Sequence, residues 1–131
     1  MLRVARDVAK LVLVLEEDFA VRESLRFALK MAGINVYAYE TVPALLNDSA
    51  LPQAACLLIG HHPPMFDAFE TISRLYAQGI QTPVILITDH AKATLRRRAA
   101  RIGIRQVIER PDFDSSLVES VKELLEPLGG T

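Results

Sequence analysis

The chain has 131 residues, of which 50% are hydrophobic and 24% are charged, and its formal net charge at pH 7 is −1. This length and apolar content fit one domain with a buried core and argue against two domains. A nearly neutral chain has no global attraction to nucleic acid or to an anionic membrane, so an electrostatic partner would have to meet a local patch.

Five apolar runs alternate with five amphipathic segments along the chain. Residues 1–9 show no clear period and form an N-terminal lead-in. After them the pattern predicts strands at 11–15, 34–39, 56–60, 83–88 and 106–108, and helices at 19–32, 42–46, 68–78, 91–102 and 115–128. Alternating strands and helices with short connections predict a parallel sheet covered on both faces by helices. The predicted domain spans residues 10–128, and residues 129–131 are a tail or a truncated linker.

Polar residues and glycines mark the ends of the predicted helices. The predicted N-caps are Asp18, Thr41, Asp67 and Asp114, and the glycines that follow helices are Gly33, Gly79 and Gly103. Glu70 stands three residues after Asp67, as in a capping box. We therefore interpret Asp67 as a helix cap and not as a reactive carboxylate.

The most informative stretch is the apolar run at 56–60, which His61-His62-Pro63-Pro64 follows. Such a run predicts a strand buried on both faces that opens into an irregular loop. In an open parallel sheet, chemistry is usually placed at the carboxyl edge of the strands. The residue at that edge is Gly60, which carries no functional group, whereas Glu16 and Glu17 end the first predicted strand.

With these motifs in this order, the chain resembles a response regulator receiver domain from about Leu11 to Leu128. The residues that carry the resemblance are the acidic pair after the first strand, Arg22, Leu25, the Pro64 loop with Asp67, Pro83-Val84-Ile85 leading to Thr88, Gly103 and Arg110-Pro111. The resemblance implies an α/β, flavodoxin-like fold with a five-stranded parallel sheet in the order 2-1-3-4-5 and helices on both faces.

The resemblance also implies a degenerate phosphorylation pocket made of Glu16, Glu17, Gly60, Thr88 and Arg110. The phosphoacceptor aspartate of the family is matched by Gly60, which has no oxygen nucleophile, so we expect a pseudo-receiver that forms no aspartyl phosphate. The acidic pair that holds magnesium in the family is matched by Glu16 and Glu17. We interpret both as solvated carboxylates and expect weak or absent magnesium binding, with no other cofactor.

Two further residues of the family's switch are replaced. Its lysine is matched by Arg110, which keeps the charge and which we expect to pair with Glu16 or Glu17. Its aromatic rotor is matched by Val107, while its threonine is kept as Thr88. A pocket altered in this way is expected to hold one conformation.

Other chemistry finds little support in the sequence. His61, His62 and His90 are interpreted as loop residues and not as a metal site, because adjacent residues of an extended segment point to opposite sides. The single cysteine, Cys56, lies in an apolar run and is expected in the core, which fits a reducing cytoplasm. The apolar run at 11–15 is too short for a membrane span or a secretory signal. We therefore expect a cytoplasmic protein and, without a nucleophile motif or phosphate loop, not an enzyme.

Charges on the last two predicted helices suggest a partner surface. The outward basic residues of the fourth helix are Arg96, Arg97 and Arg101, and the outward acidic residues of the fifth helix are Glu119, Glu123 and Glu126. A twofold axis would set the basic helix of one copy against the acidic helix of another, so we expect a homodimer through the face made by the fourth helix, fifth strand and fifth helix. Solvated helix faces are the alternative. An acidic neighbour makes the arginines a poor track for nucleic acid.

The function expected from this resemblance is an atypical receiver domain that works in two-component signalling by protein-protein contact, without aspartyl phosphorylation at the usual position. Its partners would be a histidine kinase, another regulator or an output domain. The alternative is the regulatory domain of a DNA-binding transcriptional regulator whose output domain lies beyond this chain.

Overall fold

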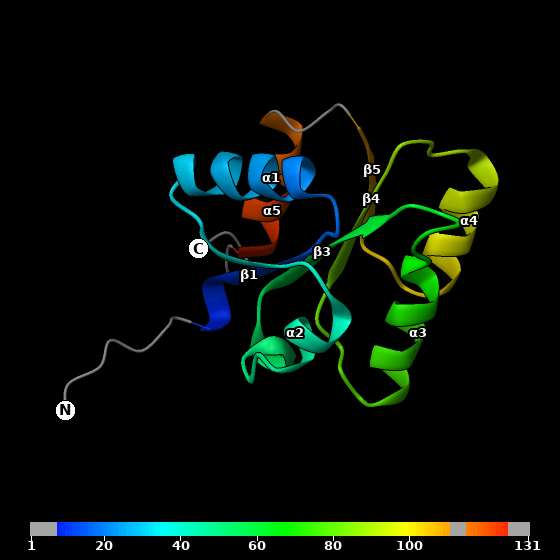
Figure 1. Ribbon diagram of the computed structural model, residues 1–131, viewed down its shortest axis with the longest axis horizontal. Helices are drawn as coiled ribbons and strands as arrows, with labels where there is room; N and C mark the ends of the chain where they lie inside the picture. The colour runs from blue at the N-terminus through cyan, green and yellow to red at the C-terminus, as the bar shows by residue number, and fades with distance from the viewer. Residues whose placement is uncertain (1–7, 111–114, 126–131) are drawn as a thin grey trace.

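The computed structural model describes residues 8–110 and 115–125. A parallel sheet of five strands forms its centre (Figure 1). The strands are β1 (Leu11–Leu15), β2 (Asn35–Tyr39), β3 (Cys56–His61), β4 (Val84–Thr88) and β5 (Gln106–Glu109). The helices are α1 (Phe19–Met31), α2 (Val42–Leu46), α3 (Ala68–Ala77), α4 (Ala93–Arg101) and α5 (Ser115–Leu125). The strand order is β2-β1-β3-β4-β5, which confirms the predicted fold class.

The sheet carries a core on each face because β1 and residues 56–59 of β3 are continuously apolar, so that apolar side chains point to both faces. Odd-numbered residues of β1, such as Leu13, pack with α2, α3 and α4 on one face, and even-numbered residues, such as Val12, pack with α1 and α5 on the other. All residues of β1 and β3 are buried. Figure 1 shows α1 and α5 together on one side of the sheet, away from α2 and α3.

The helix ends follow the predicted caps where the structure describes them. The side chains of Asp18, Thr41 and Asp67 accept hydrogen bonds from backbone N–H groups in the first turns of α1, α2 and α3. Gly33, Gly79 and Gly103 have φ values of 80°, 87° and 91°. Glycine adopts this left-handed conformation without the steric cost that a Cβ would add. The predicted cap Asp114 lies outside the described residues.

Some boundaries differ from the prediction. The helix predicted at 91–102 is α4, which begins at Ala93, and short 3-10 helices at Val8–Lys10 and Leu51–Gln53 were not predicted. Among the described residues, no helix has both the length and the apolar character that a membrane crossing needs. The two boundaries that matter for function are the ends of β1 and β3, because they face the candidate site.

Candidate functional site

The carboxyl ends of β1, β3 and β4 meet at one edge of the sheet. Leu15 of β1 is in register with Ile59 of β3, so that the next residues, Glu16 and Gly60, come side by side. The last residue of β3, His61, is in register with Thr88, the last residue of β4. The register thus brings together Glu16, Gly60 and Thr88, three of the five residues that the sequence analysis grouped.

The side chain of Glu16 is fully buried at this edge, with 0% of its surface exposed, whereas Glu17 is exposed. One carboxyl oxygen accepts a hydrogen bond from the backbone N–H of Asp18 at 2.9 Å, and both oxygens lie 2.9 Å from Nε2 of His62. The prediction of two solvated carboxylates is therefore wrong for Glu16. Burial of its carboxyl group is tolerated because these donors replace the hydrogen bonds of water.

Gly60 provides the space that the Glu16 carboxyl group occupies. A Cβ built on Gly60 would overlap Oε1 of Glu16, and it would lie 2.9 Å from both Cδ of Glu16 and Nε2 of His62. Favourable contacts between carbon atoms need about 3.5–4.0 Å. Any side chain at position 60 would therefore have to displace the buried carboxyl group.

The two adjacent histidines make different contacts, and the prediction of a loop residue is wrong for His61, which belongs to β3. His61 ends β3 and packs edge-on against the Phe69 ring, with 5.0 Å between ring centroids. His62 forms a β-bridge with Phe66, and its ring reaches Glu16. The β-ladder continues past Gly60 because the His61 backbone still pairs with Thr88, so the irregular loop begins later than the prolines suggested.

Arg110 does not meet the first-strand glutamates. Its guanidinium forms an ion pair and a hydrogen bond with Asp89, which directly follows β4. The predicted pairing with Glu16 or Glu17 is wrong because Asp89, which follows the neighbouring strand β4, binds the guanidinium instead. The arginine that does reach this end of β1 is Arg22, whose Nη1 donates to the backbone carbonyl of Glu16 at 2.8 Å.

Side-chain hydrogen bonds tie the start of α4 to β5. The carboxylate of Glu109 accepts a bond from the backbone N–H of Ala91 at 2.8 Å. Arg96 donates from Nε to the carbonyl of Ala91 at 3.1 Å and from Nη1 to the carbonyl of Val107 at 3.4 Å. Thr88 is buried, with its hydroxyl oxygen 3.4 Å from the backbone N–H of His90. The segment between β4 and α4 is therefore held at both ends.

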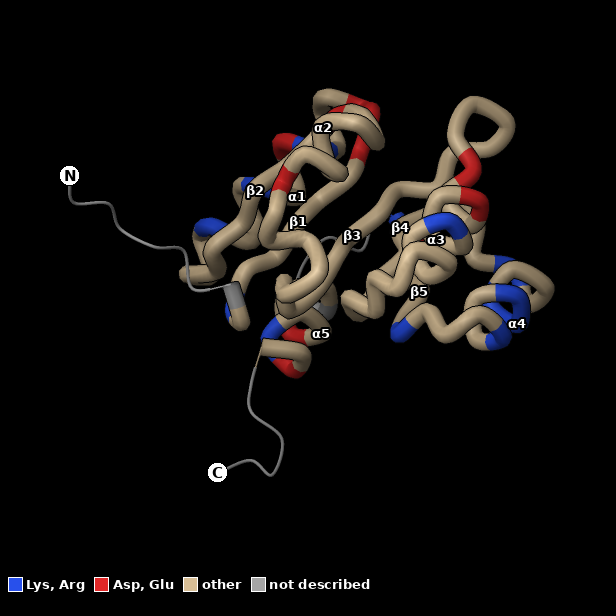
Figure 2. Tube along the Cα trace, turned by 90° about the horizontal axis from the view of Figure 1, so that it is seen from below, with Lys and Arg blue, Asp and Glu red and all other residues tan. Residues whose placement is uncertain are grey.

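The charged side chains that were expected to face outward on α4 and α5 are exposed wherever the structure describes them. Figure 2 shows basic residues gathered along α4 and both charge signs on α5. Arg97 and Arg101 are exposed on α4, and Glu119 and Glu123 are exposed on α5. The predicted Glu126 lies outside the described residues. The two helices cover opposite faces of the sheet at its β5 edge.

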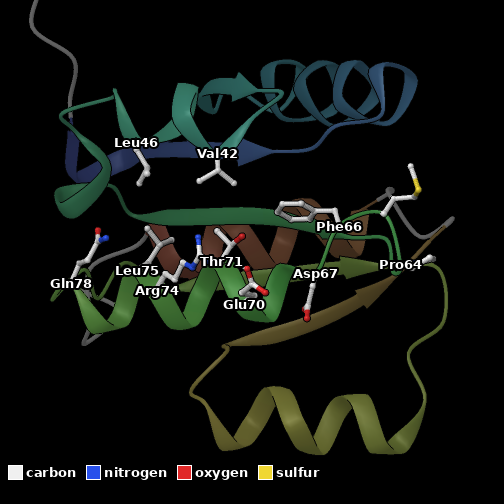
Figure 3. A pocket seen from close by; sticks show the side chains of 11 residues that line it. Val42, Leu46, Pro64, Phe66, Asp67, Glu70, Thr71, Arg74, Leu75 and Gln78 are labelled. Atoms are coloured by element: carbon white, nitrogen blue, oxygen red, sulfur yellow. Dashed lines mark ion pairs between the residues drawn. The ribbon is translucent and has the colours of Figure 1, made fainter.

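A groove of about 470 Å³ lies between α2 and α3 (Figure 3). Its lining combines apolar side chains with a polar rim: Val42, Leu46, Pro64, Met65, Phe66, Asp67, Glu70, Thr71, Arg74, Leu75 and Gln78. On the rim, Glu70 and Arg74 form an exposed ion pair at 3.2 Å. The groove begins at the loop after β3 and shares no residue with the Glu16–Gly60 contact.

Sequence reasoning missed His62 and Asp89 as members of the candidate site. Asp89 could have been found from the sequence. In the predicted strand order β4 and β5 are neighbours, so the residue after β4 lies beside the residue after β5, Arg110. His62 carried no such signal, since its contact with Glu16 depends on the path of the loop after β3. Within residues 8–110 and 115–125 there is no group of three or more His, Cys, Asp or Glu side chains placed to hold a metal ion.

Comparison with known proteins gives a consistent result. Residues 12–122 match the family described as "Response regulator receiver domain". The transcriptional regulatory protein FixJ of Azorhizobium caulinodans is 29% identical over 112 residues, which cover 86% of this chain and 53% of that protein. The C4-dicarboxylate transport transcriptional regulatory protein DctD of Pseudomonas aeruginosa is 29% identical over 120 residues, which cover 92% of this chain and 26% of that protein. The chain thus spans about half or less of the length of these relatives.

Solved structures agree with the sequence match. The response regulator receiver protein from Burkholderia phymatum has a TM-score of 0.73 and 29% sequence identity, with 88% of this chain and 94% of that chain covered. The structure of FixJ-N has a TM-score of 0.72 and 26% identity, with 88% and 91% covered. Both identities are similar to those found for the curated relatives.

Proposed function

The chain belongs to the response regulator receiver domain family, a signal-transduction family, and from this premise we propose that it acts by protein-protein contact without forming an aspartyl phosphate at the end of β3. One observation carries the proposal: the residue at that position is Gly60, and the buried carboxyl group of Glu16 fills the space beside it. Glycine offers no nucleophile, and the filled space leaves no room for one.

The buried state of Glu16 also bears on magnesium, which the family implies. Both oxygens of Glu16 lie at hydrogen-bond distance from His62, and one of them also accepts from the N–H of Asp18. Gly60 contributes no side-chain ligand, and Mg²⁺ requires several oxygen ligands in a tight octahedral arrangement. These residues do not fit a magnesium site, so no step of the proposed function uses the ion.

The contacts around the pocket support a single conformation. Arg110 is held by Asp89, and Arg96 donates to the backbone carbonyls of Ala91, in the β4–α4 segment, and of Val107, in β5. Val107, half-buried against the core on the α2, α3 and α4 face, has no ring that could swing between two positions. A receiver with these contacts would present one surface to its partner at all times.

The partner surface that we propose is the one made by α4, β5 and α5. Arg97 and Arg101 on one side and Glu119 and Glu123 on the other suit a twofold contact between two copies, in which each basic helix meets an acidic helix. Arg96 contributes less to this contact than predicted, because its guanidinium is already bonded to the carbonyls of Ala91 and Val107. Histidine kinases and output domains are the other partners that receiver domains meet.

The test of this function compares partner binding and oligomeric state with and without a small-molecule phosphodonor and magnesium. Size-exclusion chromatography with light scattering should give one mass for the wild-type chain under both conditions. The Gly60→Asp variant should also keep one mass under both conditions, because Val107 replaces the rotor. Phosphorylation of Gly60→Asp together with a change of mass would contradict the proposal.

A second candidate function has support in the relatives. FixJ and DctD are transcriptional regulatory proteins by name, and the chain covers 53% and 26% of their lengths. This receiver would then regulate a DNA-binding output domain of the same protein. Reading the gene beyond the codon for Thr131 distinguishes the two functions, since a DNA-binding domain there would favour the second and a stop codon would exclude it.

A further inference from the structure

A separate hollow lies on the face of the sheet that carries α3 and α4. Its volume is about 320 Å³, and its lining residues are His61, Phe69, Thr94, Leu95 and Arg98. α3 and α4 stand side by side there in Figures 1 and 2, and the Arg98 guanidinium lies over the Phe69 ring, 4.0 Å from its centroid. The hollow shares no residue with the Glu16–Gly60 contact.

His61 is the most unusual residue of this hollow, because it is polar and yet only 6% exposed. Nδ1 of the ring accepts a hydrogen bond from the backbone N–H of Ala68 at 3.1 Å. A neutral imidazole that accepts at Nδ1 carries its proton on Nε2. Within residues 8–110 and 115–125, Nε2 meets no acceptor, so the ring has a donor to offer at the hollow.

Arg98 adds a positive charge to the lining of the hollow. Arg98 is exposed, and its cation–π contact with Phe69 holds the guanidinium against α3. In the part of the chain that the structure describes, no carboxylate forms an ion pair with it. The nearest acidic group to His61 is Asp67, but its carboxylate lies 3.9 Å from Nδ1, the nitrogen already bonded to Ala68.

The first turn of α4 supplies further donors. Thr94 and Leu95 stand in this turn, where backbone N–H groups have no partner inside the helix. The N-cap residue is Lys92, whose side chain makes no capping hydrogen bond. The end of α4 that borders the hollow therefore carries the positive end of the helix dipole without an acidic cap.

We propose that this hollow binds a small oxyanion, a phosphate or carboxylate group, between the Arg98 guanidinium, the Nε2–H of His61 and the first turn of α4. The arrangement offers one full charge and at least one neutral donor, and none of the five lining residues is acidic. Planar guanidinium groups bind such oxygens with two parallel hydrogen bonds. The volume is large enough for one such group.

The experiment is an NMR titration of the isotope-labelled chain in a buffer free of oxyanions. Inorganic phosphate, acetate and sodium chloride are added in separate titrations at matched ionic strength. Phosphate or acetate should produce saturable shifts in the His61 ring signals and in the Thr94 and Leu95 amides, and chloride should not. The ion that saturates at lower concentration identifies the phosphate or carboxylate source.

Matched variants decide whether the effect belongs to the hollow. Arg98→Gln should weaken binding about tenfold or more, because a hydrogen bond to a charged group is lost. Arg97→Gln, on the same helix but outside the lining of the hollow, should change the affinity by less than about twofold. Equal weakening by both variants, or no saturable shift with either oxyanion, would overturn the proposal. If Arg98→Gln does not fold, Arg98→Lys should bind measurably more weakly than wild type, and unchanged affinity would likewise overturn it.

Discussion

The carboxyl group of Glu16 occupies the space in which a side chain on residue 60 would begin. The two residues fit each other, because glycine is the only residue without a Cβ and so leaves room for the carboxyl group. His62 completes the arrangement by contacting both carboxyl oxygens at 2.9 Å. The side chain at the end of β1 thus fills the space beside the end of β3.

The contact between Glu16 and Gly60 predicts a coupling between substitutions. Gly60→Ala should lower the free energy of unfolding by about 1–3 kcal/mol, because the new Cβ forces the Glu16 carboxyl group out of its hydrogen bonds. In the Glu16→Ala variant, Gly60→Ala should lower the free energy of unfolding by much less. Urea denaturation of the two single variants and the double variant measures the coupling.

Glu17 provides the control for this cycle. It stands next to Glu16 but is exposed, so Glu17→Ala and Gly60→Ala should have additive effects. Coupling of similar size in both cycles would show that Gly60→Ala disturbs the backbone in general and would contradict a specific contact with Glu16.

His62 should matter for stability as the partner of a buried carboxyl group. His62→Ala leaves Glu16 with the Asp18 N–H as its remaining donor, and the free energy of unfolding should fall by about 1–3 kcal/mol. His90→Ala, at an exposed position, should change it by less than about 0.5 kcal/mol. Equal effects of the two alanine variants in thermal or urea unfolding would argue against the Glu16–His62 contact.

Burial lowers the pKa of His61 below its ordinary value of 6.5, and the nearby Arg98 and His62 act in the same direction, while Asp67 acts against them. In the unfolded chain His61 binds a proton more readily, so its contribution to stability is present above about pH 6.5 and is lost as the pH falls through the folded pKa. An NMR titration of the ring should give a pKa below 6.5.

The free energy of unfolding provides a second measurement of the same effect. Between about pH 8 and about pH 5, wild type should lose more stability than His61→Gln, in which the titrating group is absent. A ring pKa at or above the ordinary value, or parallel pH profiles for the two proteins, would contradict the buried, neutral state of His61.

The fold could be predicted because its signals are local. Continuous apolar runs such as 11–15 and 56–60 belong to strands covered on both faces, and Asp18, Thr41 and Asp67 marked helix starts by a side-chain bond to a nearby N–H. Each of these features depends on residues within a few positions of one another.

The candidate site could be predicted only in part, because it depends on contacts between distant segments. Gly60 and Glu16 were placed correctly at the same edge, but the burial of Glu16 depends on His62, which lies 46 positions further along the chain. The partner of Arg110 was assigned to the wrong strand end, although strand order alone puts Asp89 nearer. Side-chain direction after a strand is not encoded in the apolar pattern.

The homodimer proposed for the α4–β5–α5 face depends on opposite charges. Arg97→Glu or Glu123→Arg alone should weaken the dimer, and the two changes together should partly restore it. Light scattering across a range of protein concentrations and salt concentrations measures this, and Arg26→Glu on α1 is the control. A monomer under all conditions, or a dimer unaffected by either charge reversal, would contradict this interface.

The central claim is that this receiver signals without an aspartyl phosphate at the end of β3. Its most direct test is the intact mass of the wild-type chain after incubation with magnesium and a small-molecule phosphodonor, with FixJ-N as a comparison under the same conditions. We predict that the mass of this chain stays unchanged. A mass increase of one phosphoryl group that is lost on mild acid or base treatment would show that another carboxylate has taken over from Gly60 and would contradict signalling that is independent of phosphorylation.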